Sequence, residues 1–220
     1  MITNPVKTFQ SNLPDDNHCL QACVMMLANT LGQRHLTMAE TETMTGFQFG
    51  ALTWPYRAMA ALAALGFEIR WIEVMDAALF TTDAIRAVGA HLEGDPATLE
   101  RAFRDTDIRA EQDVVRGVLE HDRVMFMQRR PTFDDIHAEL SAGGLVLCGV
   151  NGRRLYGKPG WHGHFVIVDA IDDNSVRVQN PGLPPEQNRT MSLADFEDAW
   201  ASPNWDMALF MGTRRAGGSA

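Results

Sequence analysis

The sequence predicts an α+β fold within a single domain. Helical patterns fill the first part of the 220-residue chain, and two adjacent strand patterns joined by a short turn lie near its end. Helices first and antiparallel strands last are typical of α+β proteins, whereas α/β proteins alternate the two. No internal repeat and no linker-like change in composition divides the chain, so we expect one domain over residues 1–220.

The first helical pattern, residues 18–31, runs without Gly or Pro and repeats apolar residues at helical spacing. The three residues before it are suitable N-caps, namely Asp15, Asp16 and Asn17. A short polar helix over residues 37–45 and an alanine-rich helix over residues 56–65, started by Pro55, are expected next. Alternating apolar and polar residues then predict a strand over residues 67–72.

Residues 76–122 have a different character, because alanine and charged residues dominate them at helical spacing. Gly94, Asp95 and Pro96 interrupt the pattern. We expect a helical insertion here that contributes no chemistry of its own.

The second half of the chain predicts shorter elements. These are strands over residues 124–127, 145–150, 164–170, 175–180 and 207–211, a helix over residues 133–140, and a helix capped by Ser192 that runs through Trp200. The run over residues 145–150 is apolar throughout, which is typical of a strand buried on both faces. Polar turn residues separate the strands at 164–170 and 175–180, so these two predict a hairpin.

Composition and charge exclude several classes of protein. Hydrophobic residues make up 45% of the chain and charged residues 21%, as in globular proteins, so a disordered chain is excluded. Nineteen Lys and Arg against 28 Asp and Glu give a net charge of −9. Nucleic acids and anionic membranes are therefore poor partners for this chain.

The cysteine count and the start of the chain predict its environment. Three cysteines are an odd number and too few for a disulfide framework. Nothing at the start has the pattern of an export signal, and no apolar stretch approaches the roughly 20 residues of a membrane span. We therefore expect a soluble protein of the reducing cytoplasm with free thiols.

One cysteine has the position of a nucleophile. Cys19 lies in the first turn of the first predicted helix, where unpaired N–H groups and the helix dipole stabilise a thiolate. Cys23, one turn later, and Cys148, within the apolar strand, are expected in the core.

The predicted hairpin supplies a base and a group that orients it. Its turn centres near residues 172–174, so His164 on the first strand lies roughly opposite residues 180–183 on the second. Cross-strand Cβ atoms are only about 5 Å apart, so Asn180 is expected to hydrogen-bond the His164 ring. Cys, His and Asn side chains together form one known type of catalytic triad.

Three segments carry a resemblance to a known family. Residues 17–27, NHCLQACVMML, and residues 163–168, GHFVIV, resemble the cysteine helix and the catalytic histidine strand of papain-like peptidases of the bacteriocin-processing, double-glycine-cleaving type. Residues 179–182, QNPG, resemble the Asp/Asn-Pro segment of that family. The resemblance covers most of the chain except about residues 76–122.

The resemblance implies a papain-like fold, in which an N-terminal helical half packs on a C-terminal antiparallel sheet. It also implies a peptide or peptide-like substrate and no cofactor. The catalytic residues that it implies are Cys19 as nucleophile, His164 as general base and Asn180 as the orienting residue. Trp161, beside the histidine segment, is expected to wall the substrate groove.

The sequence departs from the family pattern at two positions. Leu20 stands where the family has Gly after the cysteine, and Leu13 stands where it has a glutamine that donates to the oxyanion. The candidates to replace that glutamine are Gln10, Asn12 and Asn17. An oxyanion-hole donor is worth on the order of 3 kcal/mol in the transition state, so without one the peptidase would be slow.

Three alternatives stay open at this point. An amine in place of water would make the same thioester centre an acyltransferase. A chain that keeps the fold without turnover would be a peptide-binding module. A structural zinc site is the third, with Cys19, Cys23, His162 and His164 as ligands, although two cysteines four residues apart in one helix are not a usual zinc spacing.

Overall fold

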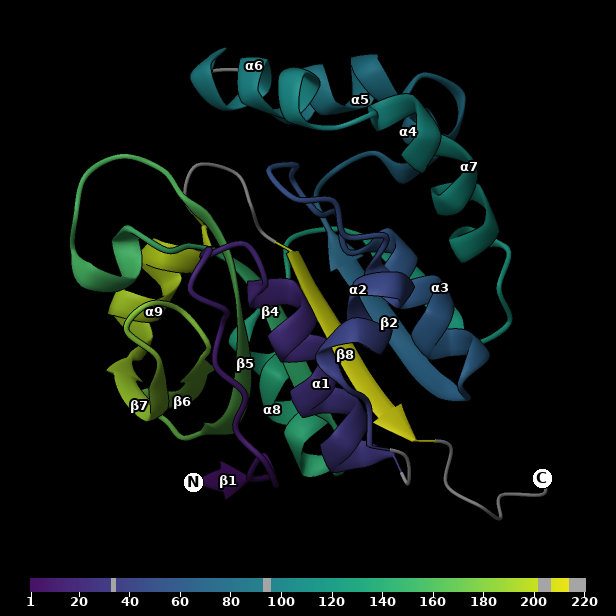
Figure 1. The fold of residues 1–220 in the computed structure, drawn as a ribbon. Coiled ribbons are helices and arrows are strands. Elements are labelled where there is room, and N and C mark those ends of the chain that lie inside the picture. Colours follow the sequence, from purple (N-terminus) through teal and green to yellow (C-terminus); the bar gives the residue numbers. More distant parts are fainter. Residues whose placement is uncertain (33–34, 93–95, 202–206, 214–220) are drawn as a thin grey trace.

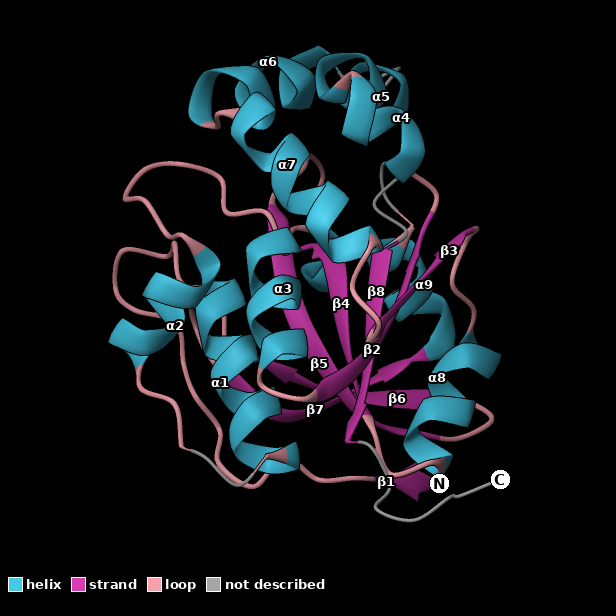
Figure 2. Cartoon of the chain, turned by 90° about the vertical axis from the view of Figure 1, so that its right-hand side faces the viewer, coloured by secondary structure: helices cyan, strands magenta, loops and turns pink. Residues whose placement is uncertain are grey.

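The structure, a computed structural model, describes residues 1–32, 35–92, 96–201 and 207–213 (Figure 1). Within these ranges, eight strands form one sheet with helices on both of its faces (Figure 2). One face is covered by α1 (Cys19–Leu31) and α3 (Tyr56–Ala64), and the other by α8 (Phe133–Ser141) and α9 (Leu193–Trp200). The α+β class predicted from the sequence is therefore confirmed.

The sheet is mixed rather than antiparallel throughout. Its strands run in the order β3-β2-β8-β4-β5-β6-β7, and β1 pairs with β5. Their bounds are β1 (Ile2–Thr3), β2 (Phe67–Glu73), β3 (Val124–Gln128), β4 (Leu145–Asn151), β5 (Gly163–Ile171), β6 (Ser175–Asn180), β7 (Glu186–Ser192) and β8 (Met207–Thr213). The pairs are antiparallel except β2 with β3, which is parallel. The expected C-terminal antiparallel sheet is thus extended by three strands from earlier in the chain, β1, β2 and β3.

The parallel pair accounts for the long helical region between β2 and β3, because parallel neighbours need a crossover connection. Four helices make that connection: α4 (Ala77–Thr82), α5 (Ala84–His91), α6 (Pro96–Asp105) and α7 (Ile108–Leu119). This helical segment lies beyond one end of the sheet, at the top of Figure 1. Aromatic packing attaches it, since the Phe80 ring lies 6.4 Å from that of Trp54 and 5.4 Å from that of Tyr56.

The predicted elements lie within a few residues of the observed ones. Thr37 caps α2 (Met38–Thr45) in a capping box with Glu40, and Ser192 caps α9. Two strands, β1 and β7, were not predicted. Because β7 is mostly polar and exposed, it lacks the alternation that marks a half-buried strand, and its pairing with β6 holds it in the sheet.

The core is centred on the middle strands of the sheet. All of β4 and nearly all of β5 are buried, as the apolar runs predicted. Leu20, Val24 and Leu27 of α1 pack into the same core. Cys23 and Cys148 are fully buried, and the three cysteines are unpaired. Across the described ranges, no helix combines the length and the apolarity needed to cross a membrane.

Candidate active site

A pocket of about 720 Å³, its open mouth included, lies where the start of α1 meets the start of β5. Cys19 is the first residue of α1 and His164 is the second of β5, and both line this pocket. Asn17 and the half-buried Trp161 line it as well. The fold therefore brings together a cysteine and a histidine that are far apart in the sequence.

The His164 ring is held by Asn180. His164 is buried, and its Nε2 atom lies 2.8 Å from Oδ1 of Asn180, the last residue of β6. The register that pairs Ile167 with Gln179 places the two residues diagonally across β5 and β6, in line with the predicted hairpin. An amide oxygen only accepts hydrogen bonds, so Nε2 carries the ring proton and Nδ1 keeps its lone pair.

The orientation of the Asn180 amide is fixed by its other partners. Its Oδ1 accepts from the backbone N–H of Gly182 at 3.0 Å. Its Nδ2 donates to Oη of Tyr156 at 2.9 Å and to Oε2 of Glu186 at 3.0 Å. Oε2 of Glu186 also accepts from Tyr156 at 2.6 Å and from Arg189 at 2.8 Å. The amide cannot turn over without setting its oxygen against that carboxylate.

These supporting residues were not identified from the sequence. Tyr156 ends a short 3₁₀ turn, η1 (Arg154–Tyr156), and Glu186 begins the unpredicted strand β7. The sheet register places Glu186 directly opposite Asn180. The one signal in the sequence was an acidic residue that soon follows the Asn-Pro-Gly turn at residues 180–182.

Cys19 holds its sulfur in a poorly solvated place. Burial raises the pKa of the Cys19 thiol to about 11, a backbone hydrogen bond from Phe165 acts in the opposite direction, and the charge of Asp16 raises it further. The thiolate expected at the helix start is therefore not the resting state. Desolvation by the surrounding loops and β5 outweighs the favourable helix N-terminus.

The Cys19 and His164 side chains are both neutral at neutral pH. Burial lowers the pKa of His164 to about 4, and the hydrogen bond to Asn180 offsets only part of this. A neutral imidazole with a lone pair on Nδ1 can accept a proton, which is what a general base requires. This differs from an ion pair that exists before the substrate arrives.

The three oxyanion candidates have different surroundings. Asn12 is buried, and its amide holds the loop before α1 through three hydrogen bonds. Gln10 donates to the adjacent backbone and does not line the pocket. Asn17 does line the pocket beside Cys19, and one of its two amide N–H groups donates to the Asp15 carbonyl at 2.6 Å. The second amide N–H of Asn17 and the backbone N–H of Cys19 are donors that belong to residues lining the pocket.

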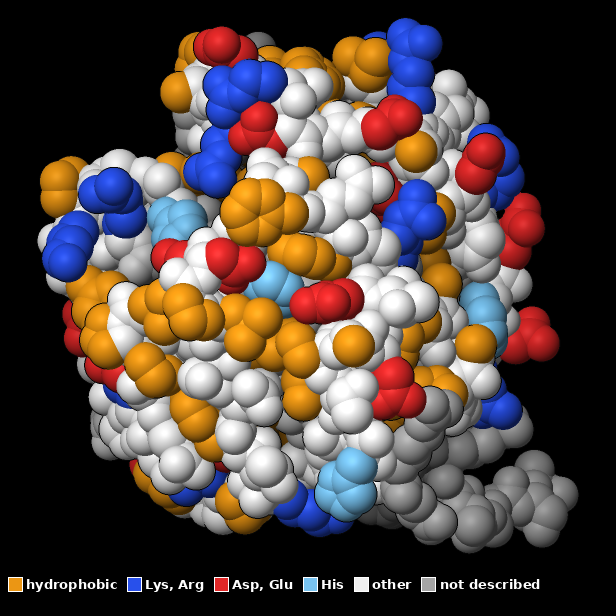
Figure 3. Space-filling model, in the orientation of Figure 1, with side chains coloured by type: hydrophobic (Ala, Val, Ile, Leu, Met, Phe, Trp, Pro, Cys, Tyr) orange, Lys and Arg blue, Asp and Glu red, His pale blue; other side chains and the backbone are white. Residues whose placement is uncertain are grey.

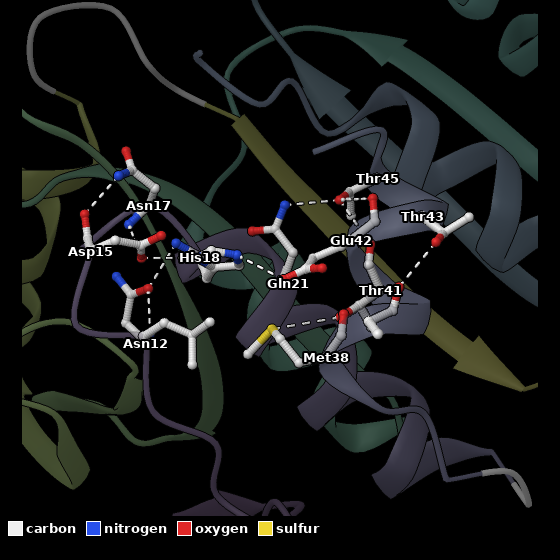
Figure 4. Close-up of polar contacts among 12 residues, drawn as sticks. Asn12, Asp15, Asn17, His18, Gln21, Met38, Thr41, Glu42, Thr43 and Thr45 are labelled. Atoms are coloured by element: carbon white, nitrogen blue, oxygen red, sulfur yellow. Dashed lines mark hydrogen bonds and ion pairs between the residues drawn. The ribbon is translucent and has the colours of Figure 1, made fainter. Parts of the chain in front are cut away.

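His18, rather than a preceding Asp or Asn, occupies the N-cap position of α1 and fixes the helix start (Figure 4). Its Nδ1 lies 2.9 Å from Oδ1 of Asp15, and its Nε2 lies 3.0 Å from Oε1 of Glu42 in α2. One turn later, Gln21 donates to Thr45 of α2 at 2.8 Å. These contacts tie the cysteine helix to α2, so the helix start that carries the nucleophile is anchored on both sides.

The residues of the zinc alternative do not form a ligand cluster. Cys23 is fully buried, and its thiol donates to the Phe165 carbonyl at 3.5 Å. Among the residues that the structure describes, no three His, Cys, Asp or Glu side chains gather as a metal site.

Similarity to known proteins was found by comparing structures and not by comparing sequences. No protein-family model and no curated protein matches the chain. Among solved structures, it is similar to the peptidase domain of Streptococcus ComA, described as a bi-functional ABC transporter involved in quorum sensing, with 13% identity over 93% of this chain and 97% of that one and a TM-score of 0.49. It is also similar to a putative C39-like peptidase from Bacillus anthracis, with 18% identity over 39% of this chain and 49% of that one and a TM-score of 0.32. Both of these proteins are named as peptidases.

Proposed function

We propose that the chain is a thiol-dependent hydrolase that cleaves a peptide or peptide-like amide bond. The observation that carries the proposal is the 2.8 Å hydrogen bond from His164 to Asn180, in which the histidine keeps the lone pair of Nδ1 and lines the same pocket as Cys19. A nucleophile, a base and a group that orients the base are the three parts that such a centre requires.

The first half of the reaction forms a thioester. Nδ1 of His164 takes the thiol proton as the Cys19 sulfur attacks the carbonyl carbon of the substrate and a C–S bond forms. The charge that develops on the carbonyl oxygen is stabilised by the Asn17 amide and the Cys19 backbone N–H. The C–N bond then breaks, and the proton on His164 passes to the leaving amine.

The second half of the reaction releases the acid. His164, neutral again, takes a proton from water, whose oxygen attacks the thioester carbon. The C–S bond breaks, the proton returns to Cys19, and the carboxylic acid leaves. An amine in place of that water gives a new amide, so the same centre supports acyl transfer when an amine outcompetes water.

A mixture of unstructured peptides of varied sequence tests the proposal, with new peptide ends identified by mass spectrometry. We expect the full chain to cleave a subset of the peptides and Cys19→Ala to lose this cleavage. Cys148→Ala, which removes a buried thiol that does not line the pocket, is expected to retain it. Products joined to an added amine would identify an acyltransferase.

The contrary result is equally clear. Peptides bound but left intact by the folded protein would identify a binding module, and cleavage that survives in Cys19→Ala would exclude this centre.

A further inference from the structure

The helical segment supplies a cation to the pocket, contrary to the expectation that it takes no part in the chemistry. Arg101 of α6 borders the pocket that Cys19 and His164 line. Its guanidinium carbon lies 5.9 Å from the ring centroid of Trp161. Helix α6, which lies outside the segments that resemble the family, therefore borders the pocket together with Trp161.

Within its own helix, Arg101 makes a long ion pair that it shares with a second arginine. Asp105, one turn later, approaches Nε of Arg101 only to 3.5 Å. The same carboxylate accepts two shorter hydrogen bonds from Arg104, at 2.7 and 3.1 Å. Asp105 thus faces two guanidinium groups, and Glu100 is the other acidic residue of α6. The helix as a whole is neutral, and the positive charge at the pocket border is that of the Arg101 side chain itself.

Other charges make the pocket electrically asymmetric. Burial lowers the pKa of His162, which lines the pocket; the negative charge of Asp16 acts against this shift, and the positive charges of Arg101 and Arg153 add to it. The acidic residue at the pocket border is Asp16, on the Cys19 side, where its carboxylate accepts from Asn12 at 2.9 Å. Figure 3 shows Lys and Arg side chains over the loop that follows β4, and Lys and Arg interspersed with Asp and Glu over α6. The positive side of the pocket is therefore the side away from the cysteine loop.

We infer that the substrate carries a carboxylate close to the scissile bond and that Arg101 binds it. A guanidinium binds a carboxylate through two parallel hydrogen bonds, which fixes its orientation as well as its charge. With a net charge of −9, the rest of the molecule repels an acidic peptide, so a local cation is what such a substrate needs at the pocket. The inference rests on the proposed function and adds the charge of the substrate to it.

Two affinity labels of equal size test the inference without turnover: the α-amides of bromoacetyl-glutamate and bromoacetyl-glutamine. With either label the Cys19 sulfur displaces bromide and forms a C–S bond, so the thiolate fraction cancels when the two rates are divided. We expect the glutamate label to modify Cys19 about threefold faster, the size of a screened charge interaction across a wet pocket. The ratio should approach one at about 1 M salt, where the Debye length is only about 3 Å.

Matched variants assign the effect to one side chain. Arg101→Gln is expected to bring the rate ratio to one, and Arg101→Lys to keep it above one. Arg109→Gln removes an exposed arginine of the same helical segment that does not line the pocket, so the ratio should stay at the wild-type value. A ratio that Arg101→Gln leaves at the wild-type value overturns the inference, as does a wild-type ratio of one.

Failure of the inference differs from failure of the proposed function. Equal labelling of Cys19 by both reagents, in a protein that cleaves neutral peptides, removes only the preference for a carboxylate. If the folded protein prefers the glutamate label but cleaves no peptide, the anion site at Arg101 stands and the proposed hydrolase activity is wrong.

Discussion

At the scale of single residues, the candidate site depends on how one amide is turned. Asn180 presents its oxygen to His164 and its nitrogen to Glu186, so a carboxylate on β7 determines which nitrogen of the histidine carries the proton. The hydrogen bond made by one ring nitrogen fixes the state of the other. Glu186 is thus a positioning residue that acts through Asn180.

Glu186→Ala is expected to lower kcat for peptide cleavage about tenfold, with little change in KM. Without the carboxylate, the Asn180 amide can turn over and donate to His164, which favours the tautomer whose Nδ1 cannot accept the thiol proton. A tenfold loss corresponds to about 1.4 kcal/mol, close to the value of a hydrogen bond to a charged group. Steady-state kinetics on a cleaved peptide measure the effect.

The conservative variant separates positioning from a general loss of structure. Glu186→Gln keeps an acceptor oxygen and should restore most of kcat. If Glu186→Ala were as fast as wild type while Asn180→Ala was slow, Asn180 would keep its orientation without the carboxylate.

The reactivity of Cys19 should depend steeply on pH. Because burial raises the pKa of its thiol to about 11, the thiolate fraction grows about tenfold with each pH unit through the neutral range. We expect the rate of Cys19 alkylation by iodoacetamide, mapped by mass spectrometry, to rise with that slope past pH 9. A short unstructured peptide with one cysteine and blocked ends serves as the control, and its rate should level off near the ordinary cysteine pKa of about 8.5. A rate that is flat from about pH 6 to 8 would instead indicate a resting thiolate–imidazolium pair.

At the scale of elements, the site depends on the turn that leaves β6. Gly182 follows Asn180 closely, and a Cβ atom at Gly182 would lie 2.9 Å from Oδ1 of Asn180 and 3.2 Å from Nε2 of His164. The backbone therefore passes so near the histidine–asparagine bond that only a residue without a side chain fits.

Gly182→Ala is expected to lower kcat by at least about tenfold, because the methyl group separates two groups whose hydrogen bond is worth roughly 1 kcal/mol or more. The melting temperature should change little, since the strands themselves stay paired. Gly117→Ala, in the last turn of α7 with open space around it, is the control. It should keep full activity and gain up to about 1 kcal/mol of unfolding free energy. Full activity in Gly182→Ala would contradict the described geometry.

At the scale of the whole molecule, the sequence predicted the parts of the structure that have local signals. The helix from Cys19 to Leu31 and the apolar strand β4 follow from periodicity and burial. The pairing of His164 with Asn180 follows from the length of a hairpin. These features are encoded over short stretches of chain.

Features that depend on distant contacts were not predictable in the same way. The parallel pairing of β2 with β3 joins strands on either side of the helical segment, and Arg101 reaches the pocket from that segment. The raised pKa of Cys19 was not predictable from the sequence, because desolvation depends on how β5 packs over the helix start, which a local pattern does not encode. Tertiary packing thus determined both the charge state and the electrostatics of the site.

Two buried histidines and a buried glutamate, whose pKa values shift in opposite directions, should set the pH dependence of stability. Burial lowers the pKa of His91 and of His164 to about 4, so the stability that they contribute is complete above 6.5 and is lost as pH falls toward 4. Burial raises the pKa of Glu73 to about 8, against a hydrogen bond from Trp71, so its contribution is complete below 4.5 and is lost as pH rises toward 8. We expect the unfolding free energy to be largest near pH 6.5 and to fall by about 2 kcal/mol by pH 8.

Urea unfolding across this pH range measures the effect. Glu73→Gln keeps an acceptor for Trp71 and cannot ionise, so its stability should stay level between about pH 6.5 and 8. An equal alkaline loss in wild type and Glu73→Gln would assign that loss to other groups.

Direct detection of the acyl-enzyme tests the central claim, which is that Cys19 attacks an acyl carbon with His164 as its base. The protein is mixed with a peptide that it cleaves, and the reaction is quenched in acid. The chain is then digested, and the mass of the fragment that contains Cys19 is measured by mass spectrometry. The thioester mechanism predicts that this fragment gains the mass of the amino-terminal product in wild type and gains nothing in Cys19→Ala or His164→Ala. Peptide cleavage at the wild-type rate with no mass added to Cys19, or with Cys19 replaced, would contradict it.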